Sequence, residues 1–183
     1  MFQDLSKFSV PAGFRGRSLA VVQLWWCVEA LLFRPSPQIF YRWRTMLLRI
    51  FGAQIGVGVK IRPSASVTYP WKLSIGDFCH IGEDVTLYTL GRIDIGSHTV
   101  ISQGSYICAA GHRYDDVNFP LYAAPIVIEP EVWLAAECFV MPGVTVGKGA
   151  VCNVRSLVTK DIPAGAVAMG HPAKVVAWRG RCG

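Results

Sequence analysis

Several features are missing from this sequence, and their absence argues against whole classes of protein. No two of the six cysteines form a Cys-x-x-Cys pair and no secretory leader is present, which argues against metal and disulfide roles. The apolar run at residues 19–33 is interrupted by Gln23 and Glu29 and is too short to span a bilayer, which needs about twenty apolar residues. No nucleic-acid-binding module is present, and a basic pI alone is weak evidence for such a partner. We therefore expect no nucleic acid partner, and thiols that behave as small hydrophobic side chains in a reducing compartment.

An aliphatic residue returns every six positions from Ile55 onward, a period that neither an α-helix nor a simple strand produces. The frame comprises Ile55, Ile61, Val67, Ile75, Ile81, Leu87, Ile95, Ile101, Ile107, Ile128, Leu134, Val140, Val146, Cys152 and Val158. Two steps are eight residues long and one is twenty-one, and all three follow a third hexapeptide. The pattern predicts a three-sided parallel β-helix, in which each short strand pairs with its equivalent in the next coil at about 4.8 Å.

The other positions of the hexapeptide support this interpretation. The fifth position is held mostly by small residues, which fit beside an aliphatic stack in a narrow interior. These are Val59, Ala65, Cys79, Val85, Thr99, Ser105, Val132, Cys138, Val144, Ala150 and Ser156. Glycine or a small residue often follows the aliphatic one, as expected where the backbone turns tightly or takes an unusual dihedral angle. Trp71 and Gly91, beside the two eight-residue steps, are expected in corner loops.

Most of the positive charge precedes the repeats. Residues 1–54 contain seven Lys and Arg and two acidic residues, which accounts for +5 of the net +6. We predict two helices in this segment, joined by a proline-rich connection. They could cover the open end of the β-helix, which would otherwise expose backbone and apolar side chains. A compatible alternative is that Arg42, Arg44 and Arg49, set among aromatic and aliphatic residues, place a basic surface on an anionic membrane.

The longest interruption of the repeat, residues 108–127, contains His112. Long ordered loops on rigid scaffolds are common sites of function, although a lone His is more often a surface or structural residue. The chain also carries a set of short motifs: Gly-His-Arg-Tyr-Asp (111–115), Phe-Pro-Leu (119–121), Val-Trp-Leu-Ala-Ala (132–136), Pro-Gly-Val-Thr-Val-Gly (142–147), Val-Thr-Lys-Asp-Ile-Pro (158–163) and Gly-His-Pro-Ala-Lys (170–174). With the hexapeptides, these motifs resemble the hexapeptide-repeat acyltransferases over about residues 55–174. Within that family they are most similar to sugar O-acetyltransferases of colanic acid and other exopolysaccharide synthesis.

The resemblance implies an all-β fold, a left-handed parallel β-helix of about five coils with N-terminal helices and an extended C-terminal tail. The general base of the family falls on His112, which would accept the proton of a hydroxyl as its oxygen attacks the thioester of acetyl-CoA, with no metal. The second ring nitrogen needs an acceptor that fixes the tautomer. Asp115, Asp116, Glu137 or a backbone carbonyl could provide it, and the sequence leaves this choice open.

Contacts to CoA are also implied by position in the family. Trp133 resembles the aromatic residue that lines the pantetheine and acceptor cleft, and the backbone amides near Ala135 and Ala136 are candidate partners of the thioester or pantetheine arm. Three residues match positions that face the nucleotide and phosphates of CoA, where cations have an electrostatic use. They are Thr159, Lys160 and Lys174. The simpler alternatives are an exposed Trp at a corner and a solvated basic edge.

The resemblance further implies a cytoplasmic homotrimer with active sites between neighbouring chains, acting on a nucleotide- or lipid-linked saccharide. Several related enzymes place an Asn in the acceptor pocket, but residues 82–88 contain none. N-acetylation of an amino sugar and O-acetylation of serine therefore stay open as alternatives. We divide the chain into an N-terminal helical segment (1–54), a β-helix catalytic domain (55–163) with the excursion 108–127, and a C-terminal tail (164–183).

Two other classes share the expected fold. The γ-type carbonic anhydrases hold a metal with three His residues that coil stacking and a subunit boundary bring together. His80 and His98 are one coil length apart, but they occupy the sixth and fourth positions of their hexapeptides, so we expect that they do not stack. A non-catalytic trimeric scaffold is the remaining alternative.

Overall fold

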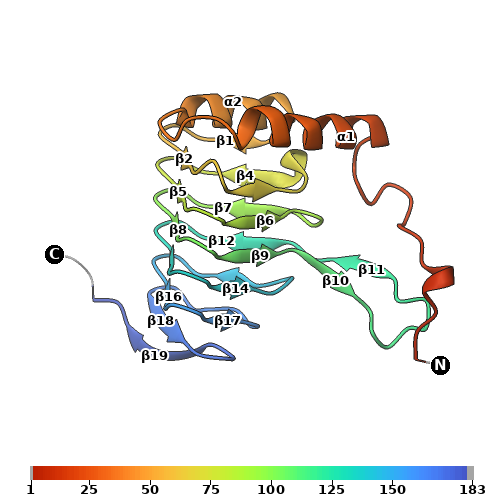
Figure 1. The fold of residues 1–183 in the computed structure, drawn as a ribbon. Coiled ribbons are helices and arrows are strands. Elements are labelled where there is room, and N and C mark those ends of the chain that lie inside the picture. Colours follow the sequence, from red (N-terminus) through yellow and green to blue (C-terminus); the bar gives the residue numbers. More distant parts are fainter. Residues whose placement is uncertain (1, 181–183) are drawn as a thin grey trace.

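The computed structural model describes residues 2–180, which form a three-sided prism with helices across one end and a ribbon that projects from the side (Figure 1). The helical segments are η1 (Leu5–Lys7), α1 (Leu19–Val28), the π-helical η2 (Glu29–Phe33), α2 (Tyr41–Ile50) and η3 (Pro70–Lys72). Because η2 follows α1 directly, the two form one continuous helix. Within residues 2–180, no helix is both long enough and apolar enough to cross a membrane.

Short strands make up the walls of the prism and the ribbon. The first sheet contains β1 (Gln54–Ile55), β4 (Leu73–Ile75), β7 (Ile93–Ile95), β12 (Ile126–Ile128) and β15 (Thr145–Val146). The second contains β2 (Lys60–Ile61), β5 (His80–Ile81), β8 (Val100–Ile101), β13 (Trp133–Leu134), β16 (Val151–Cys152), β18 (Ala166–Met169) and β19 (Lys174–Trp178). The third contains β3 (Ser66–Val67), β6 (Thr86–Tyr88), β9 (Tyr106–Cys108), β14 (Phe139–Val140) and β17 (Leu157–Val158). The ribbon consists of β10 (Ala110–His112) and β11 (Leu121–Ala123).

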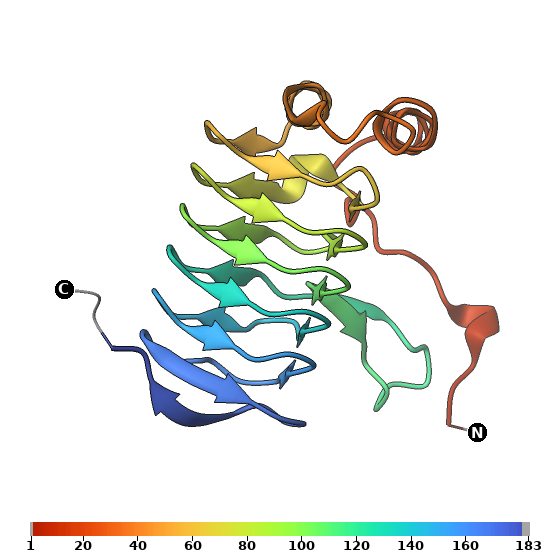
Figure 2. The same cartoon turned by 60° about the vertical axis from the view of Figure 1, so that its left-hand side comes forward.

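Successive coils pair in the register that the hexapeptides predict (Figure 2). Ile61 lies beside Ile81, and Ile81 lies beside Ile101. Five coils are complete, and a sixth begins where Ile162 bridges to Val146 and β18 pairs with β16. The β-helix prediction is therefore confirmed, with a partial coil beyond the five expected. The last strand, β19, turns back antiparallel to β18, and residues 181–183 of the expected tail lie outside the described residues.

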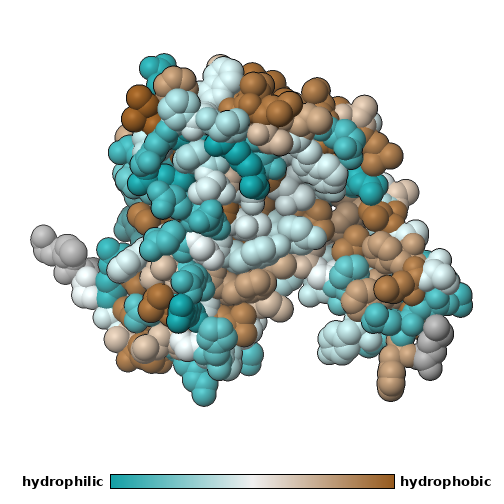
Figure 3. Space-filling model, viewed as in Figure 1, coloured by the Kyte–Doolittle hydropathy of each residue, from teal (hydrophilic) through white to brown (hydrophobic). Residues whose placement is uncertain are grey.

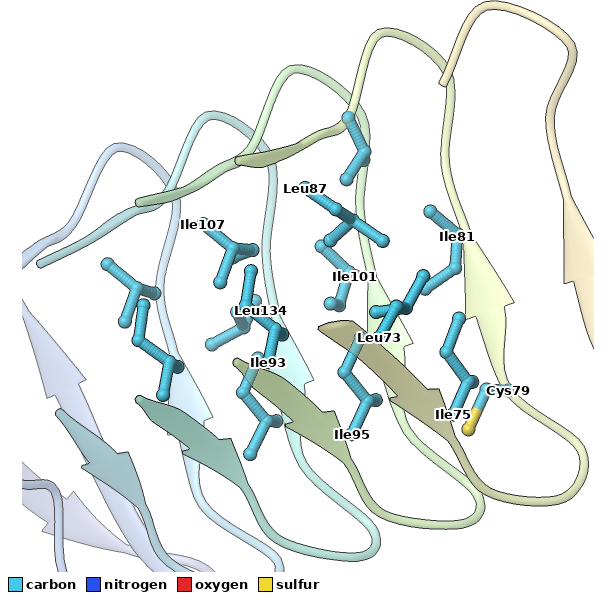
Figure 4. Packing of buried hydrophobic residues seen from close by; sticks show 14 of the residues in the cluster. Leu73, Ile75, Cys79, Ile81, Leu87, Ile93, Ile95, Ile101, Ile107 and Leu134 are labelled. Atoms are coloured by element: carbon cyan, nitrogen blue, oxygen red, sulfur yellow. The ribbon is translucent and has the colours of Figure 1, made fainter. Parts of the chain in front are cut away.

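The interior of the prism is the stack of aliphatic first positions and small fifth positions, joined in the first sheet by the large side chains of Leu73, Ile93 and Ile126 (Figure 4). Leu87 and Ile107 at first positions and Ala65 at a fifth position are all fully buried. Cys138 and Cys152 are core residues as well, and burial raises the pKa of the Cys152 thiol to about 12. Such a thiol stays protonated and packs as a small apolar group, as the sequence predicted.

Two positions of the hexapeptide place different demands on the backbone. At the second position, a Cβ on Gly76 would lie 2.6 Å from the backbone nitrogen of Ser97 in the next coil, so the close approach of neighbouring coils excludes a side chain. Positive φ angles occur two residues later, as at Gly58 (66°) and His98 (58°). An unusual dihedral angle was one of the two reasons expected for glycine at the second position. The structure shows this angle at the fourth position instead.

The corner loops lie where the eight-residue steps predict them. Trp71 is in η3 between β3 and β4, and Gly91 is in the turn between β6 and β7. The Trp71 ring stacks on Tyr69, with centroids 5.1 Å apart, and its Nε1 donates a hydrogen bond to the carbonyl of Arg15. This corner therefore anchors the chain segment that precedes α1.

The helices α1, η2 and α2 cover the first coil of the prism (Figure 1). A parallel sheet that starts here leaves carbonyl groups with no preceding strand to pair with. Side chains from the helices satisfy one such carbonyl on each of the three sides: Trp25 Nε1 donates to Val67 at 2.7 Å, Arg44 Nε to Ile61 at 2.7 Å, and Arg49 Nη2 to Ile55 at 2.8 Å. The helices thus close the three sheet edges chemically as well as sterically.

Arg44 has a structural role that the sequence did not reveal. Its side chain is fully buried, and desolvation lowers the pKa of the guanidinium. Besides the Ile61 carbonyl, the guanidinium donates to Ser36 Oγ at 2.8 Å and to the carbonyls of Pro37 and Gln38 at 2.9 and 2.6 Å. The expectation that Arg44 lies on an outward basic surface is therefore wrong.

Candidate active site

The interruption between β9 and β12 folds into the antiparallel ribbon β10–β11, which leaves the prism at the corner between the third and first sheets (Figure 1). His112 ends β10 opposite Leu121. Gly111 precedes it because a Cβ there would lie 2.9 Å from the ring of Tyr122. The ribbon therefore holds the imidazole on paired backbone, away from the body of the prism.

The backbone around His112 fixes its tautomer. His112 Nδ1 lies 2.8 Å from the carbonyl oxygen of Phe119. A carbonyl can only accept a hydrogen bond, so Nδ1 carries the proton and Nε2 of the neutral ring is a free base. Phe119 itself has a φ of 49°, an unfavourable conformation for a residue with a side chain and one that is common at functional sites.

Two phenyl rings contact the imidazole of His112. Phe119 stacks on it with centroids 4.2 Å apart and an interplanar angle of 9°, and Phe8 lies at 5.6 Å. Phe8 belongs to the segment before α1, which runs from the helices to the ribbon, where the Asp4 N–H donates to Val117 O at 2.7 Å. The sequence placed Phe119 in a motif but assigned it no role, and it gave no sign of Phe8, because no motif links residues 2–18 to the ribbon.

The acidic residues considered as partners of His112 have other contacts. Asp116 Oδ1 accepts the backbone N–H of Asn118, and Glu137 accepts Arg155 Nε at 2.6 Å. Asp115 has no hydrogen-bonded side-chain partner within residues 2–180. Of the alternatives that the sequence left open, a backbone carbonyl occupies the Nδ1 position.

Trp133 lies on the outer face of the second sheet, on β13. Its side chain is half-exposed, and its Nε1 donates to Ser102 Oγ at 3.0 Å, which fixes the indole against the neighbouring coil. The ring lines a hollow of ≈ 430 Å³ together with His98, Val100, Arg179 and the acidic Glu131. An apolar surface beside a cation can accept the pantetheine arm and a phosphate of CoA.

The two alanines that follow β13 differ in their backbone hydrogen bonds. The Ala135 N–H donates to the carbonyl of Cys152 at 2.9 Å, so the sheet already uses it. Within the described part of the chain, the Ala136 N–H has no hydrogen-bond partner, while the Ala136 carbonyl accepts the N–H of Arg155. The Ala136 amide is therefore the one of the pair that can donate to a ligand.

The other expected CoA contacts lie near the end of the prism opposite the helices. Thr159 and Lys160 follow β17, Lys174 begins β19, and all three are exposed. Neither lysine forms an ion pair with any residue among 2–180. One chain does not gather all the expected residues, because His112 projects from the corner opposite the sheet that carries Trp133.

The sequence is 55% identical over 177 residues to a protein of Escherichia coli (strain K12) named "Putative colanic acid biosynthesis acetyltransferase WcaF". The alignment covers 97% of this chain and 97% of that protein. The chain belongs to the hexapeptide-repeat acetyltransferases. Among solved structures, a hexapeptide-repeat acetyltransferase from Vibrio cholerae superposes with a TM-score of 0.82 at 22% identity, over 97% of this chain and 98% of that one. A maltose O-acetyltransferase from Clostridium difficile 630 superposes with a TM-score of 0.72 at 25% identity, over 89% and 88%. No protein-family model matches the chain.

As a hexapeptide-repeat acetyltransferase, the protein has the left-handed β-helix of its structural neighbours, which confirms the fold expected from the sequence. The His residues that suggested a competing metal enzyme lie apart, as expected. His80 pairs with Val100 in the next coil, while His98 stacks on Phe78 at a turn, with ring centroids 5.3 Å apart. Residues 2–180 contain no group of three or more His, Cys, Asp or Glu that could hold a metal ion.

Proposed function

We propose that this acetyltransferase transfers the acetyl group of acetyl-CoA to a saccharide hydroxyl in exopolysaccharide or lipid-linked saccharide synthesis. The observation that carries the proposal is the Nδ1 hydrogen bond of His112 to the Phe119 carbonyl, because it leaves Nε2 as a positioned base. The names of the relatives support it. The relative from E. coli is named for colanic acid biosynthesis, the V. cholerae neighbour was crystallised with acetyl-CoA, and the C. difficile neighbour is a maltose O-acetyltransferase.

The proposed chemistry needs one base and no covalent enzyme intermediate. Nε2 of His112 accepts the proton of the acceptor hydroxyl while the hydroxyl oxygen bonds to the thioester carbon. The carbonyl oxygen of the thioester becomes an oxyanion, to which the Ala136 N–H can donate. The tetrahedral intermediate then expels the CoA thiolate, which takes the proton back from the imidazolium, so the enzyme returns to its starting state.

We infer that each active site forms between two chains. His112 projects from the corner between the third and first sheets, whereas Trp133 and Lys174 belong to the second sheet, which is the opposite side of the same prism. A site that uses His112 and the second-sheet residues therefore needs a neighbouring molecule. A threefold ring completes three such sites with no surface left unpaired.

Light scattering at the concentration used for assays should therefore give a mass near three times 20.1 kDa. Mixing the inactive variants His112→Ala and Trp133→Ala should restore part of the activity, because some interfaces then combine an intact His112 with an intact Trp133. A fully active monomer, or no recovery after proven subunit exchange, would contradict the shared site.

Acetyl transfer can be tested directly with labelled acetyl-CoA. The purified protein should label a saccharide acceptor from a screen of nucleotide- and lipid-linked sugars, and mass analysis should find one acetyl ester per labelled molecule. The ester should be cleaved by mild base, whereas an amide on an amino sugar would survive. Labelling of serine or of amino groups alone would replace the proposed sugar O-acetylation with one of the alternatives.

A saccharide attached to a membrane lipid would bring its acetyltransferase to the inner face of the cytoplasmic membrane. The proposal therefore includes a cytoplasmic enzyme with peripheral membrane contact through residues 1–54. In this division, residues 55–163 perform the chemistry and the tail from residue 164 contributes to CoA binding.

A further inference from the structure

The outer face of the helical cap, formed by α1, η2, α2 and the connection between η2 and α2, is unusually apolar. Large apolar side chains are exposed in each of these segments, and Figure 3, which views the cap from the side, shows apolar atoms among hydrophilic ones along its upper edge. They are Leu19, Leu24, Trp26, Leu31, Leu32, Ile39, Phe40, Met46 and Ile50. Leu31 and Ile39 are 71% and 78% exposed, so burial in the prism does not explain them. An exposed apolar face of this extent marks a surface that binds a partner.

The charges on this outer face have one sign. Arg34 and Arg42 are exposed and form no ion pair with any residue among 2–180. The two acidic residues before Asp77 point elsewhere: Glu29 accepts the backbone N–H of Val67 in the first coil, and Asp4 lies at the ribbon. The cap therefore presents cations and apolar groups without an exposed carboxylate on its helices.

Two hollows interrupt this face. One of ≈ 300 Å³ is lined by Leu31, Leu32, Pro35 and Phe40. A larger one of ≈ 840 Å³ lies between α2 and the first coil, where Phe40 and Met46 meet Arg42, Arg49 and Lys60. The smaller hollow has no cation in its lining, whereas apolar walls and cations adjoin in the larger one, a combination that accepts acyl chains together with phosphate groups.

We propose that the helical cap docks on the surface of an anionic lipid bilayer. A helix with an apolar face and Arg at its margin lies in the plane of the headgroups, where the apolar side chains enter the acyl boundary and the cations meet the lipid phosphates. A second copy of the cap fits poorly, since two cationic faces without carboxylates repel each other. The buried face of α1 and α2 is already occupied by the first coil, so docking uses the outer face and leaves the fold unchanged.

This placement rests on the membrane contact in the proposed function and specifies its surface, while lipid binding by the cap is independent of the chemistry at His112. It also defines an orientation. The helices lie across the end of the prism (Figures 1 and 2), so the prism stands upright on the bilayer with its C-terminal end farthest from the lipid.

The test is co-sedimentation of the full chain with vesicles. Vesicles of equal parts phosphatidylglycerol and phosphatidylcholine should bind the protein at low ionic strength and release it as salt rises, while pure phosphatidylcholine should bind it weakly. The double variant Arg34→Gln and Arg42→Gln should weaken binding by roughly tenfold or more, and Leu31→Ser with Ile39→Ser should do the same. These four side chains are exposed, so the melting temperature should stay that of the unaltered protein.

A matched control removes two cations from the other end. Lys148 and Arg155 are exposed on turns of the fifth coil, each in a surface ion pair, so Lys148→Gln with Arg155→Gln changes net charge by the same amount at little cost in stability. This control should bind the anionic vesicles as the unaltered protein does. Equal weakening by both charge variants would show attraction by net charge alone and would overturn the proposal.

Two further results would overturn it. One is the absence of binding to anionic vesicles at low salt. The other is concentration-dependent association of the protein with itself that is lost in the Leu31→Ser and Ile39→Ser double variant. That result would identify a protein as the partner of the cap. Acetylation of a water-soluble acceptor, measured on the same preparations, separates this inference from the proposed function. Cap variants that lose lipid binding should keep that activity, whereas failure of acetyl transfer would leave the vesicle result intact.

Discussion

Replacing His112 with Ala should lower kcat by roughly 10²–10⁴-fold and leave the Kd for acetyl-CoA nearly unchanged, because a positioned base acts in the transition state. The imidazole lies at the end of β10 and contributes little to the core, so the variant should fold normally. Single-turnover kinetics and calorimetric titration with CoA measure the two quantities separately. A variant that retains more than a third of the original kcat would show that His112 is not the base.

The ribbon also provides the matched control for this experiment. Asp115→Asn removes a carboxylate three residues from His112 that does not bond to the ring, and Asp116→Asn removes one that bonds to Asn118. Because the Phe119 carbonyl already fixes the tautomer, both variants should keep kcat within about threefold of the original. A loss as large as that of His112→Ala in either variant would identify a carboxylate as the orienting group during turnover.

Replacing Arg44 with Met should destabilise the protein by roughly 3–5 kcal/mol, because several buried acceptors lose hydrogen bonds from a charged group, each worth about 1.5–3 kcal/mol before the structure relaxes. Met retains most of the volume of the side chain but none of its hydrogen bonds. The carbonyls of Ile61, Pro37 and Gln38 and the hydroxyl of Ser36 would lose their donor. Denaturant titration and thermal unfolding, monitored at the tryptophans, measure the effect.

Arg42→Met is the control for this change, since it removes an exposed Arg from the same helix with the same new side chain. Its free energy of unfolding should stay within about 0.5 kcal/mol of the original value, as is usual for surface substitutions. Equal free energies of unfolding for Arg44→Met and Arg42→Met would mean that the hydrogen bond from Arg44 to the Ile61 carbonyl, at the edge of the second sheet, does not stabilise the protein.

The sequence predicted the repeat well because the period of a β-helix is set by local geometry. A first-position residue such as Ile81 must point inward in every coil, and a fifth-position residue such as Ala65 must be small beside it, so each hexapeptide carries its own signal. The second-position glycine was found for the same reason, although its cause is contact with the next coil and not its own φ angle, as Gly76 shows.

The cap and the surroundings of the base could not be predicted, because they depend on contacts between segments far apart in sequence. Nothing local distinguishes Arg44, which is buried, from Arg42, which is exposed, since both occur in the same basic and aromatic helix. The partner of His112 is a main-chain carbonyl, and every residue type has one, so the sequence does not identify it. Phe8 is far from His112 in the sequence and contacts the imidazole only in the folded protein. Motif resemblance pointed to His112 but not to the groups that hold its imidazole.

The β-helix holds the ribbon at a fixed distance from the outer face of the helical cap, and the coil from which the ribbon departs sets that distance. The ribbon follows β9 in the third coil, so two coil steps of about 4.8 Å and one helix layer of about 10 Å separate its root from the outer face of the cap. If that face rests on lipid, the root of the ribbon that carries His112 lies about 20 Å above the headgroups, beyond the reach of a sugar joined directly to the lipid phosphate. Such an enzyme would acetylate sugars farther along a growing chain, and lengthening the prism by one coil between α2 and β9 would move the selected sugar outward by about 5 Å.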